Sequence, residues 1–208
     1  MFLILVAASL LPAQQASMQC ADTGATIASV QTQPVRGPDG TLAVLKVSSA
    51  DDHGKNSHEC QADYQLVLVR GAADAPASAD LLSSDGEYGR NLSLRLNGFS
   101  QDGKRIYGIL IEDGQYPSTT LFEYDLAKST LQLFDLNEQF ARILNRNCTA
   151  TFDAIGNTAK GAIVLELNYA NACAPASRWL LTSANSRVQP LPPSASLQPL
   201  YEPNASTP

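Results

Sequence analysis

Apolar and polar residues along residues 92–136 follow the pattern of a four-stranded antiparallel meander. Leu92, Leu94 and Leu96 alternate with polar residues, which predicts a strand with one buried face. Residues 106–111 are apolar throughout, and a strand needs that pattern when both of its faces are covered. Further strands are predicted at 120–124 and 131–133, with turns at Gln101-Asp102-Gly103 and Asp113-Gly114. The unit has the size of one propeller blade, about 45 residues.

The same order of signals occurs three times, which predicts repeats at about 20–85, 86–140 and 147–187. The first and third copies are predicted from strands at 26–33, 42–47 and 64–69, then 151–155, 162–167 and 178–182, with turns at Gly37-Pro38-Asp39-Gly40 and Gly156-Asn157. The first copy is longer because it contains an inserted loop, residues 48–60.

Two segments differ from the repeats. Residues 137–145 predict a short helix that covers a sheet edge, with Asn137 as its cap and Phe140, Ile143 and Leu144 on its buried face. After Arg187 the chain is rich in Pro, which predicts an extended or disordered tail over residues 188–208 that forms no regular ladder.

The stretch from Phe99 to Ile106 reads FSQDGKRI and resembles the blade motif of TolB-type β-propellers, with Gln101 where that family usually has Pro. The resemblance implies an architecture and leaves the chemistry open. Three blades are fewer than the four to eight that usually close a propeller. The predicted fold is therefore all-β, with about three blade-like meanders that form a partial or small propeller; the alternative is a β-sandwich. Association into an oligomer that completes a ring is one of the options.

The first 16 residues contain no charged side chain and include an apolar run that is too short to span a membrane, which predicts a signal peptide cleaved after Ala16. The expected product is exported, periplasmic or secreted, with a single domain over residues 17–187 and no transmembrane segment. A lipid anchor at Cys20 is the alternative to ordinary export. The formal net charge of −6, with scattered Lys and Arg, argues against a nucleic-acid partner.

An oxidising compartment favours pairing of the four cysteines. Cys20 and Cys148 precede the first strands of the first and third copies, and Cys60 and Cys173 precede the third strands of the same copies. The repeat therefore predicts disulfides between Cys20 and Cys60 and between Cys148 and Cys173.

The inserted loop carries both histidines of the chain. His53 and His58, with the carboxylates of Asp51, Asp52 and Glu59, are candidate ligands for zinc or another divalent ion. The alternative is an exposed acidic loop with incidental histidines, and no cofactor is otherwise expected.

The remaining aromatic and acidic residues of interest are assigned to a loop, the core, a sheet edge or turns. Tyr116 is a candidate contact residue in a hairpin loop, whereas Trp179 is expected in the core. Glu166 is expected either at a sheet edge or in an ion pair. The acids Glu112, Asp113, Glu123 and Asp125 are interpreted as solvated turn residues rather than as a glycosidase pair.

No catalytic grouping is recognised in the sequence. Two functions follow from these observations. The first is an exported, non-enzymatic binding module that holds a protein or glycan partner with loops 48–60 and 112–119. The second is a metal-dependent hydrolase or metal-binding protein that uses the histidine loop.

Overall fold

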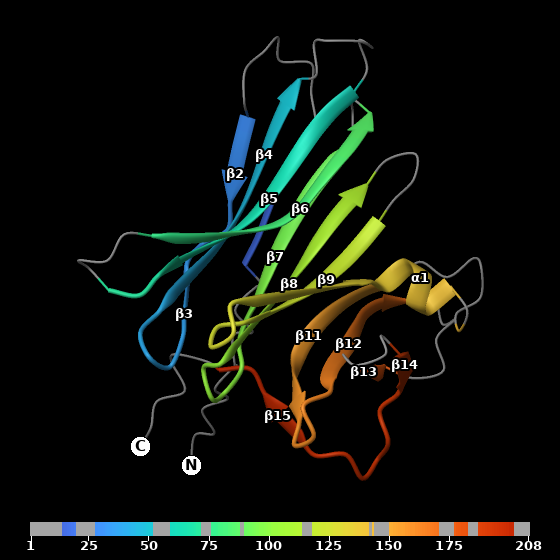
Figure 1. Cartoon of the computed structure of the whole chain (residues 1–208). Coiled ribbons are helices and arrows are strands. Elements are labelled where there is room, and N and C mark those ends of the chain that lie inside the picture. Colours follow the sequence, from blue (N-terminus) through green and yellow to red (C-terminus); the bar gives the residue numbers. More distant parts are fainter. Residues whose placement is uncertain are drawn as a thin grey trace, which may run out of the picture.

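Three antiparallel sheets form the described part of the chain in the computed structural model (Figure 1). The structure describes residues 14–19, 28–51, 59–71, 76–87, 90–113, 118–141, 143, 150–170, 177–182 and 187–201. The N-terminal sheet contains β2 (Ala28–Gln31), β3 (Val35–Arg36), β4 (Leu42–Asp51), β5 (Glu59–Val69) and β6 (Ala77–Glu87). The middle sheet contains β1 (Gln14–Gln19), β7 (Asn91–Phe99), β8 (Arg105–Asp113), β9 (Ser118–Asp125) and β10 (Thr130–Asp135). The C-terminal sheet contains β11 (Ala150–Thr158), β12 (Ile163–Ala170), β13 (Arg178–Thr182), β14 (Arg187–Pro190) and β15 (Leu197–Pro199).

Each sheet is built on one meander of strands that pair in chain order. The orders are β2-β4-β5-β6, with β3 also on β4, then β7-β8-β9-β10 and β11-β12-β13-β14. One extra strand joins the first strand of the second and third meanders: β1 pairs with β7, and β15 pairs with β11. The all-β class and the three consecutive meanders are therefore confirmed. Among the described strands no sheet closes into a barrel or a propeller.

The middle sheet is covered on both faces, so the three sheets stack as layers. In β8, Ile106 and Leu110 belong to a core shared with the N-terminal sheet, whereas Tyr107 and Ile109 belong to a core shared with the C-terminal sheet. Successive side chains of a strand point to opposite faces, so this division places one neighbouring sheet on each side. The continuous apolar run in this strand is explained by that double cover, as its pattern predicted.

The middle and C-terminal sheets are joined by an apolar core and by polar contacts beside it. Trp179, on β13, is fully buried in the core between the middle and C-terminal sheets, as expected, and its ring lies edge-on to Phe140 at a centroid distance of 5.2 Å. Beside this apolar region, Asp153 of β11 accepts hydrogen bonds from Arg95 at 2.6 Å and from Asn97 at 2.9 Å, both on β7. Polar contacts therefore join the two layers where β7 presents its polar face.

The prediction of a turn at Gly156-Asn157 is wrong. Gly156 lies within β11, at a shift in the pairing register, with a φ of +154°. The turn comes later, where Gly161 donates a backbone hydrogen bond to the carbonyl of Thr158. The corresponding bonds in the other two meanders run from Gly40 to the carbonyl of Gly37 and from Gly103 to the carbonyl of Ser100. The three turns are thus alike, and the third was misplaced because a bulge glycine imitates a turn signal.

The prediction that residues 48–60 form a loop is also wrong at both ends. The ladder of β4 and β5 continues as far as the pair Asp51 and Cys60. Only residues 52–58, which lie outside the described residues, connect the two strands. Ser49 and Ala62 are paired and buried, so the alternation of buried and outward-facing positions continues into this polar sequence. Within the predicted strand 26–33, the described strand β2 ends at Gln31, where the side-chain oxygen of Thr32 accepts the amide of Leu45; β3 follows as a separate short strand.

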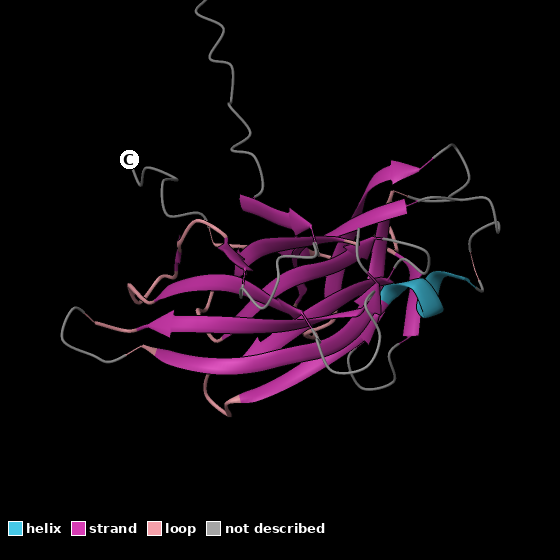
Figure 2. Cartoon of the chain, turned by 90° about the horizontal axis from the view of Figure 1, so that it is seen from above, coloured by secondary structure: helices cyan, strands magenta, loops and turns pink. Residues whose placement is uncertain are grey.

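The predicted helix is shorter than expected and is capped by a different residue. Helix α1 (Leu136–Ala141) lies beside the ends of the strands (Figure 2). Asp135, rather than Asn137, accepts the amide of Glu138 at 3.0 Å. Phe140 is buried as predicted, but Ile143 lies beyond the helix and is 39% exposed.

The prolines after Arg187 do not prevent pairing, so the prediction of an unpaired tail over residues 188–208 is wrong for residues 188–190 and 197–201. β14 pairs with β13, and β15 pairs with β11 from Leu197 opposite Thr158 to Pro199 opposite Gly156. Leu200 then donates its amide to Ile155 of β11 at 3.1 Å, and Tyr201 donates to Phe99 of β7 at 2.8 Å. This closing segment, residues 197–201, therefore joins the middle and C-terminal sheets.

The N-terminal strand extends across the predicted cleavage point. β1 pairs with β7 from Gln14 opposite Leu96 to Gln19 opposite Asn91, so Ala16 lies inside the ladder. Processing after Ala16 remains a prediction. No helix among the described residues has the length and apolar character needed to cross a membrane.

Candidate binding groove

Two cavities meet where the start of β8 faces the turn between β11 and β12. Their volumes are about 920 Å³ and about 730 Å³. Both are lined by Arg105, Thr158, Ala159 and Gly161. One cavity extends toward the turn between β9 and β10 and residues 192–196, and the other toward Ser100 and β15. Together they form a groove between the middle and C-terminal sheets.

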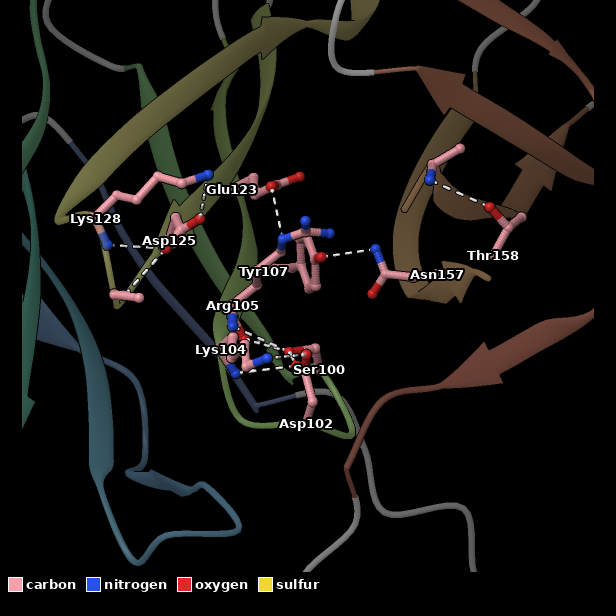
Figure 3. A network of polar contacts seen from close by, with 12 residues as sticks. Ser100, Asp102, Lys104, Arg105, Tyr107, Glu123, Asp125, Lys128, Asn157 and Thr158 are labelled. Atoms are coloured by element: carbon pink, nitrogen blue, oxygen red, sulfur yellow. Dashed lines mark hydrogen bonds and ion pairs between the residues drawn. The ribbon is translucent and has the colours of Figure 1, made fainter. Parts of the chain in front are cut away.

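Arg105 lines both cavities, and Figure 3 shows its contact with Glu123. Its Nε is 3.3 Å from Oε1 of Glu123, whose side chain is 9% exposed, and it also hydrogen-bonds to the Tyr107 hydroxyl. Desolvation lowers the pKa of Arg105, but the hydrogen bond to Tyr107 and the charge of Glu123 outweigh it and raise the pKa. The guanidinium is therefore held in one orientation and remains charged.

Gly161, in the turn between β11 and β12, lies against this guanidinium. Its φ of +83° is one that other residues adopt at a cost. A side chain built there would begin 3.5 Å from Nη1 and 3.8 Å from Nη2 of Arg105. Glycine at this position therefore serves the turn, and the turn backbone lies close to both Nη atoms of Arg105.

Tyr107 connects the Arg105 site to the C-terminal sheet. Its hydroxyl oxygen accepts a hydrogen bond of 2.7 Å from Nδ2 of Asn157 in β11, and Asn157 is 6% exposed. Burial raises the pKa of Tyr107 to about 12, and the negative charge of Glu123 adds to that effect. The phenol is therefore neutral in the physiological range and acts in positioning.

Two carboxylates at the rim are fixed by local hydrogen bonds (Figure 3). Asp102 accepts from the Ser100 hydroxyl at 2.7 Å and the Lys104 amide at 3.1 Å; burial would raise its pKa, but these bonds outweigh burial and lower it. Asp125 accepts from the Lys128 amide, which lowers its pKa, and its Oδ2 lies 3.3 Å from Nζ of Lys128. Both carboxylates are thus ionised at neutral pH.

Hydroxyl and amide side chains make up much of the remaining lining. The larger cavity also contains the exposed side chain of Lys160. Its other polar residues include Thr130, Gln132, Thr182, Gln189, Ser194 and Ser196. Such a surface offers many donors and acceptors to a polar ligand.

The interpretation of the acids as solvated turn residues is wrong for two of them. Glu112 and Glu123 are each 7% exposed. Glu112 accepts a hydrogen bond of 3.1 Å from Nη1 of Arg90, and Glu123 pairs with Arg105. Each acid lies in a strand between covered layers, so an arginine compensates for its burial. Glu166 is likewise paired, with Arg178 at 3.1 Å.

Sequence reasoning missed the groove because its residues come from strands far apart in the chain. One local signal was available: Glu123 stands between Phe122 and Tyr124 in an apolar run, which requires a partner. The register that places Tyr107 directly opposite Glu123 was not predictable from that run.

Most of the sequence-predicted site residues lie outside the described part of the chain. These are Asp52, His53, His58, Tyr116, Cys20, Cys148 and Cys173. The backbones of Asp51 and Glu59 lie at the facing ends of β4 and β5. The described residues contain no group of three or more His, Cys, Asp or Glu side chains that could hold a metal ion. The metal site therefore stays a prediction.

Cys60 is the predicted disulfide residue that the structure does describe. It is 1% exposed and disulfide-bonded, and its partner lies outside the described residues. The pairing of Cys60 with Cys20 therefore stays a prediction.

Comparisons with protein-family models, with curated proteins and with solved structures find no match to this chain.

Proposed function

We propose that this protein is an exported, non-enzymatic binding module that holds an elongated polar ligand in the groove between its middle and C-terminal sheets. The observation that carries the proposal is the junction of the two cavities over Arg105, with Thr158, Ala159 and Gly161 on the opposite wall. A ligand that occupies both cavities must be long enough to cross this junction.

The polar groups of the groove are already held in place. Arg105, Asp102 and Asp125 each have bonded partners within the protein. A site with fixed polar groups loses little conformational freedom when a ligand binds, which favours affinity and selectivity. The sheets behind it supply a rigid support, because the middle sheet is packed on both faces.

Export is supported by two features of the chain. The apolar run near the N-terminus has the length of a signal-peptide core. A disulfide at Cys60 fits an oxidising compartment.

The test is to map ligand binding by amide NMR with two panels of probes, soluble oligosaccharides and short peptides. Binding in the groove should shift the amide signals of residues 158–162. Ala159→Trp should weaken binding about 10-fold or more, because a bulky side chain would occupy the junction of the cavities. Ala159 is exposed in a turn, so the variant should fold.

Ala77→Trp is the matched control, since Ala77 is an exposed residue of β6 that lines neither cavity. A ligand from either panel that binds with equal affinity to both tryptophan variants would place binding elsewhere and overturn the proposal. Failure of every probe to shift the groove amides would also count against it.

A further inference from the structure

We infer that the groove recognises an anionic group of its ligand, a carboxylate, phosphate or sulfate, through the guanidinium of Arg105 with assistance from Lys160. The inference rests on the proposed binding function and specifies the chemistry of the ligand. It begins from the guanidinium of Arg105, which lines both cavities and belongs to a side chain that is 34% exposed.

The guanidinium is pre-oriented for such a group. Glu123 engages Nε at 3.3 Å, and Tyr107, itself held by Asn157, contacts the same side chain. Arginine donors arranged as a fixed fork match two oxygens of a carboxylate or phosphate. Because the side chain of Arg105 is 34% exposed, a ligand can reach it from the groove.

The charges around the larger cavity favour an anion. Its lining includes three cations, Arg105, Lys128 and Lys160, and two carboxylates, Glu123 and Asp125. Lys128 pairs with Asp125, whereas Lys160 has no ion pair among the described residues. This excess of one positive charge is confined to the larger cavity, because Asp102 lines the other one, and it lies on a chain whose formal net charge is −6.

The ion pair between Glu123 and Arg105 is compatible with binding of an anion by the same guanidinium. In the absence of ligand, Glu123 balances the partly buried charge of Arg105, which would otherwise be costly. The Glu123 carboxylate binds Nε of Arg105 and not the edge formed by Nη1 and Nη2. The arrangement therefore stabilises the arginine without closing its ligand-facing side.

The test uses inorganic phosphate, sulfate and succinate as probes, each titrated at constant ionic strength. Amide signals of residues 158–161 and the Nε signal of Arg105 should shift with at least one probe. Succinate active alone would identify a carboxylate site, and phosphate or sulfate active alone would identify a tetrahedral oxyanion. Raising the salt concentration should weaken binding because the lysines are exposed.

Three variants test the residues. Arg105→Lys retains the charge but loses the fork, and binding should weaken about 10-fold, the factor that corresponds to about 1.4 kcal/mol. Lys160→Gln should weaken binding about 2- to 5-fold. Lys46→Gln is the control, since Lys46 lies on β4 of the N-terminal sheet and lines neither cavity, and it should bind like the wild type.

The outcomes separate this inference from the proposed function. If neutral oligosaccharides or peptides bind the groove while Arg105→Lys and Lys160→Gln leave their affinity unchanged, the anion site is wrong and the binding function stands. Equal effects of Lys160→Gln and Lys46→Gln would mean nonspecific attraction of charge, and would overturn the inference. Absence of any response to the three anions would overturn it as well.

Discussion

The side-chain amide of Asn157, on the first strand of the C-terminal sheet, donates a 2.7 Å hydrogen bond to the hydroxyl of Tyr107, on the second meander strand of the middle sheet. Both residues are buried, at 6% and 0% exposure. The bond therefore crosses between two layers in a region that water does not compete for. It also reaches the groove, because Tyr107 contacts Arg105.

Tyr107→Phe should destabilise the protein by about 1–3 kcal/mol, since it leaves the buried Nδ2 of Asn157 without that acceptor. The free energy of unfolding can be measured in urea from the fluorescence of Trp179, the single tryptophan of the chain. In a double-mutant cycle, Asn157→Ala should cost less when it is combined with Tyr107→Phe than when it is made in the wild type. Independent, additive losses would show that the bond contributes nothing.

Alkaline pH should reduce stability through Tyr107. Its folded-state pKa of about 12 lies above the ordinary tyrosine value of 10, so the neutral form is favoured by folding. The stabilisation is complete below pH 10 and is lost as the pH rises from 10 through 12. Burial raises the pKa of Tyr64 as well, and the charge of Glu112 adds to the shift, so that residue contributes in the same direction. The free energy of unfolding should fall less steeply over this window in Tyr107→Phe than in the wild type, and identical slopes would contradict the assignment.

Removal of the Glu112 charge should be far more costly than removal of the Glu166 charge. The side chains of Arg90 and Glu112 are each 10% exposed, so Glu112→Gln leaves a buried arginine without its counter-ion, at a cost of about 3 kcal/mol. The matched pair of Glu166 and Arg178 is 38% and 48% exposed, and Glu166→Gln should cost less than about 1 kcal/mol. Urea unfolding of the two variants provides the comparison. Similar losses would mean that the Arg90 pair is effectively solvated.

Gly156→Ala should release the closing segment. A methyl group at residue 156 would overlap the carbonyl of Gln198, so β15 must shift away from β11. Amide hydrogen exchange at Leu200 and Tyr201 should then become faster. Gly40→Ala is the control, because it also has a positive φ, +85°, but meets no atom nearer than 3.9 Å. Unchanged protection of both amides in Gly156→Ala would show that the strand adapts locally.

Cys60 should be linked to Cys20 in the mature protein, and Cys148 to Cys173. Peptide mapping under non-reducing conditions identifies the linked pairs directly. Cys60→Ala should lower stability by about 2–5 kcal/mol, since it removes a cross-link from a buried strand position. A peptide that joins Cys60 to Cys148 or Cys173 would contradict the pairing inferred from the repeats.

The strands were predictable where hydrophobic periodicity alone determines the structure. The run at residues 106–111 indicated a strand covered on both faces, and β8 has that environment. The third turn was not predictable in the same way, because Gly156-Asn157 is a stronger local turn signal than the segment that ends at Gly161. Pairing with β15 selects the bulge at Gly156, and that interaction involves residues some forty positions away.

The groove depends still more on tertiary structure. Arg105, Glu123 and Asn157 are ordinary polar residues in the sequence, and their relation arises from strand register and from the stacking of two sheets. The disposition of β9 and β11 around β8 was not encoded in any single motif. Local pattern therefore identified the meanders, whereas the candidate site required their assembly.

The late position of the closing segment affects how the protein is made. Tyr201, whose amide binds the carbonyl of Phe99, is translated 102 residues after its partner. At ordinary rates of synthesis, the acceptor on β7 waits roughly 5 to 20 s for that donor. During this interval the first two meanders can already pack together, while the interface between the middle and C-terminal sheets is still incomplete on the ribosome. Nascent chains paused before residue 197 would consequently expose this interface to chaperones.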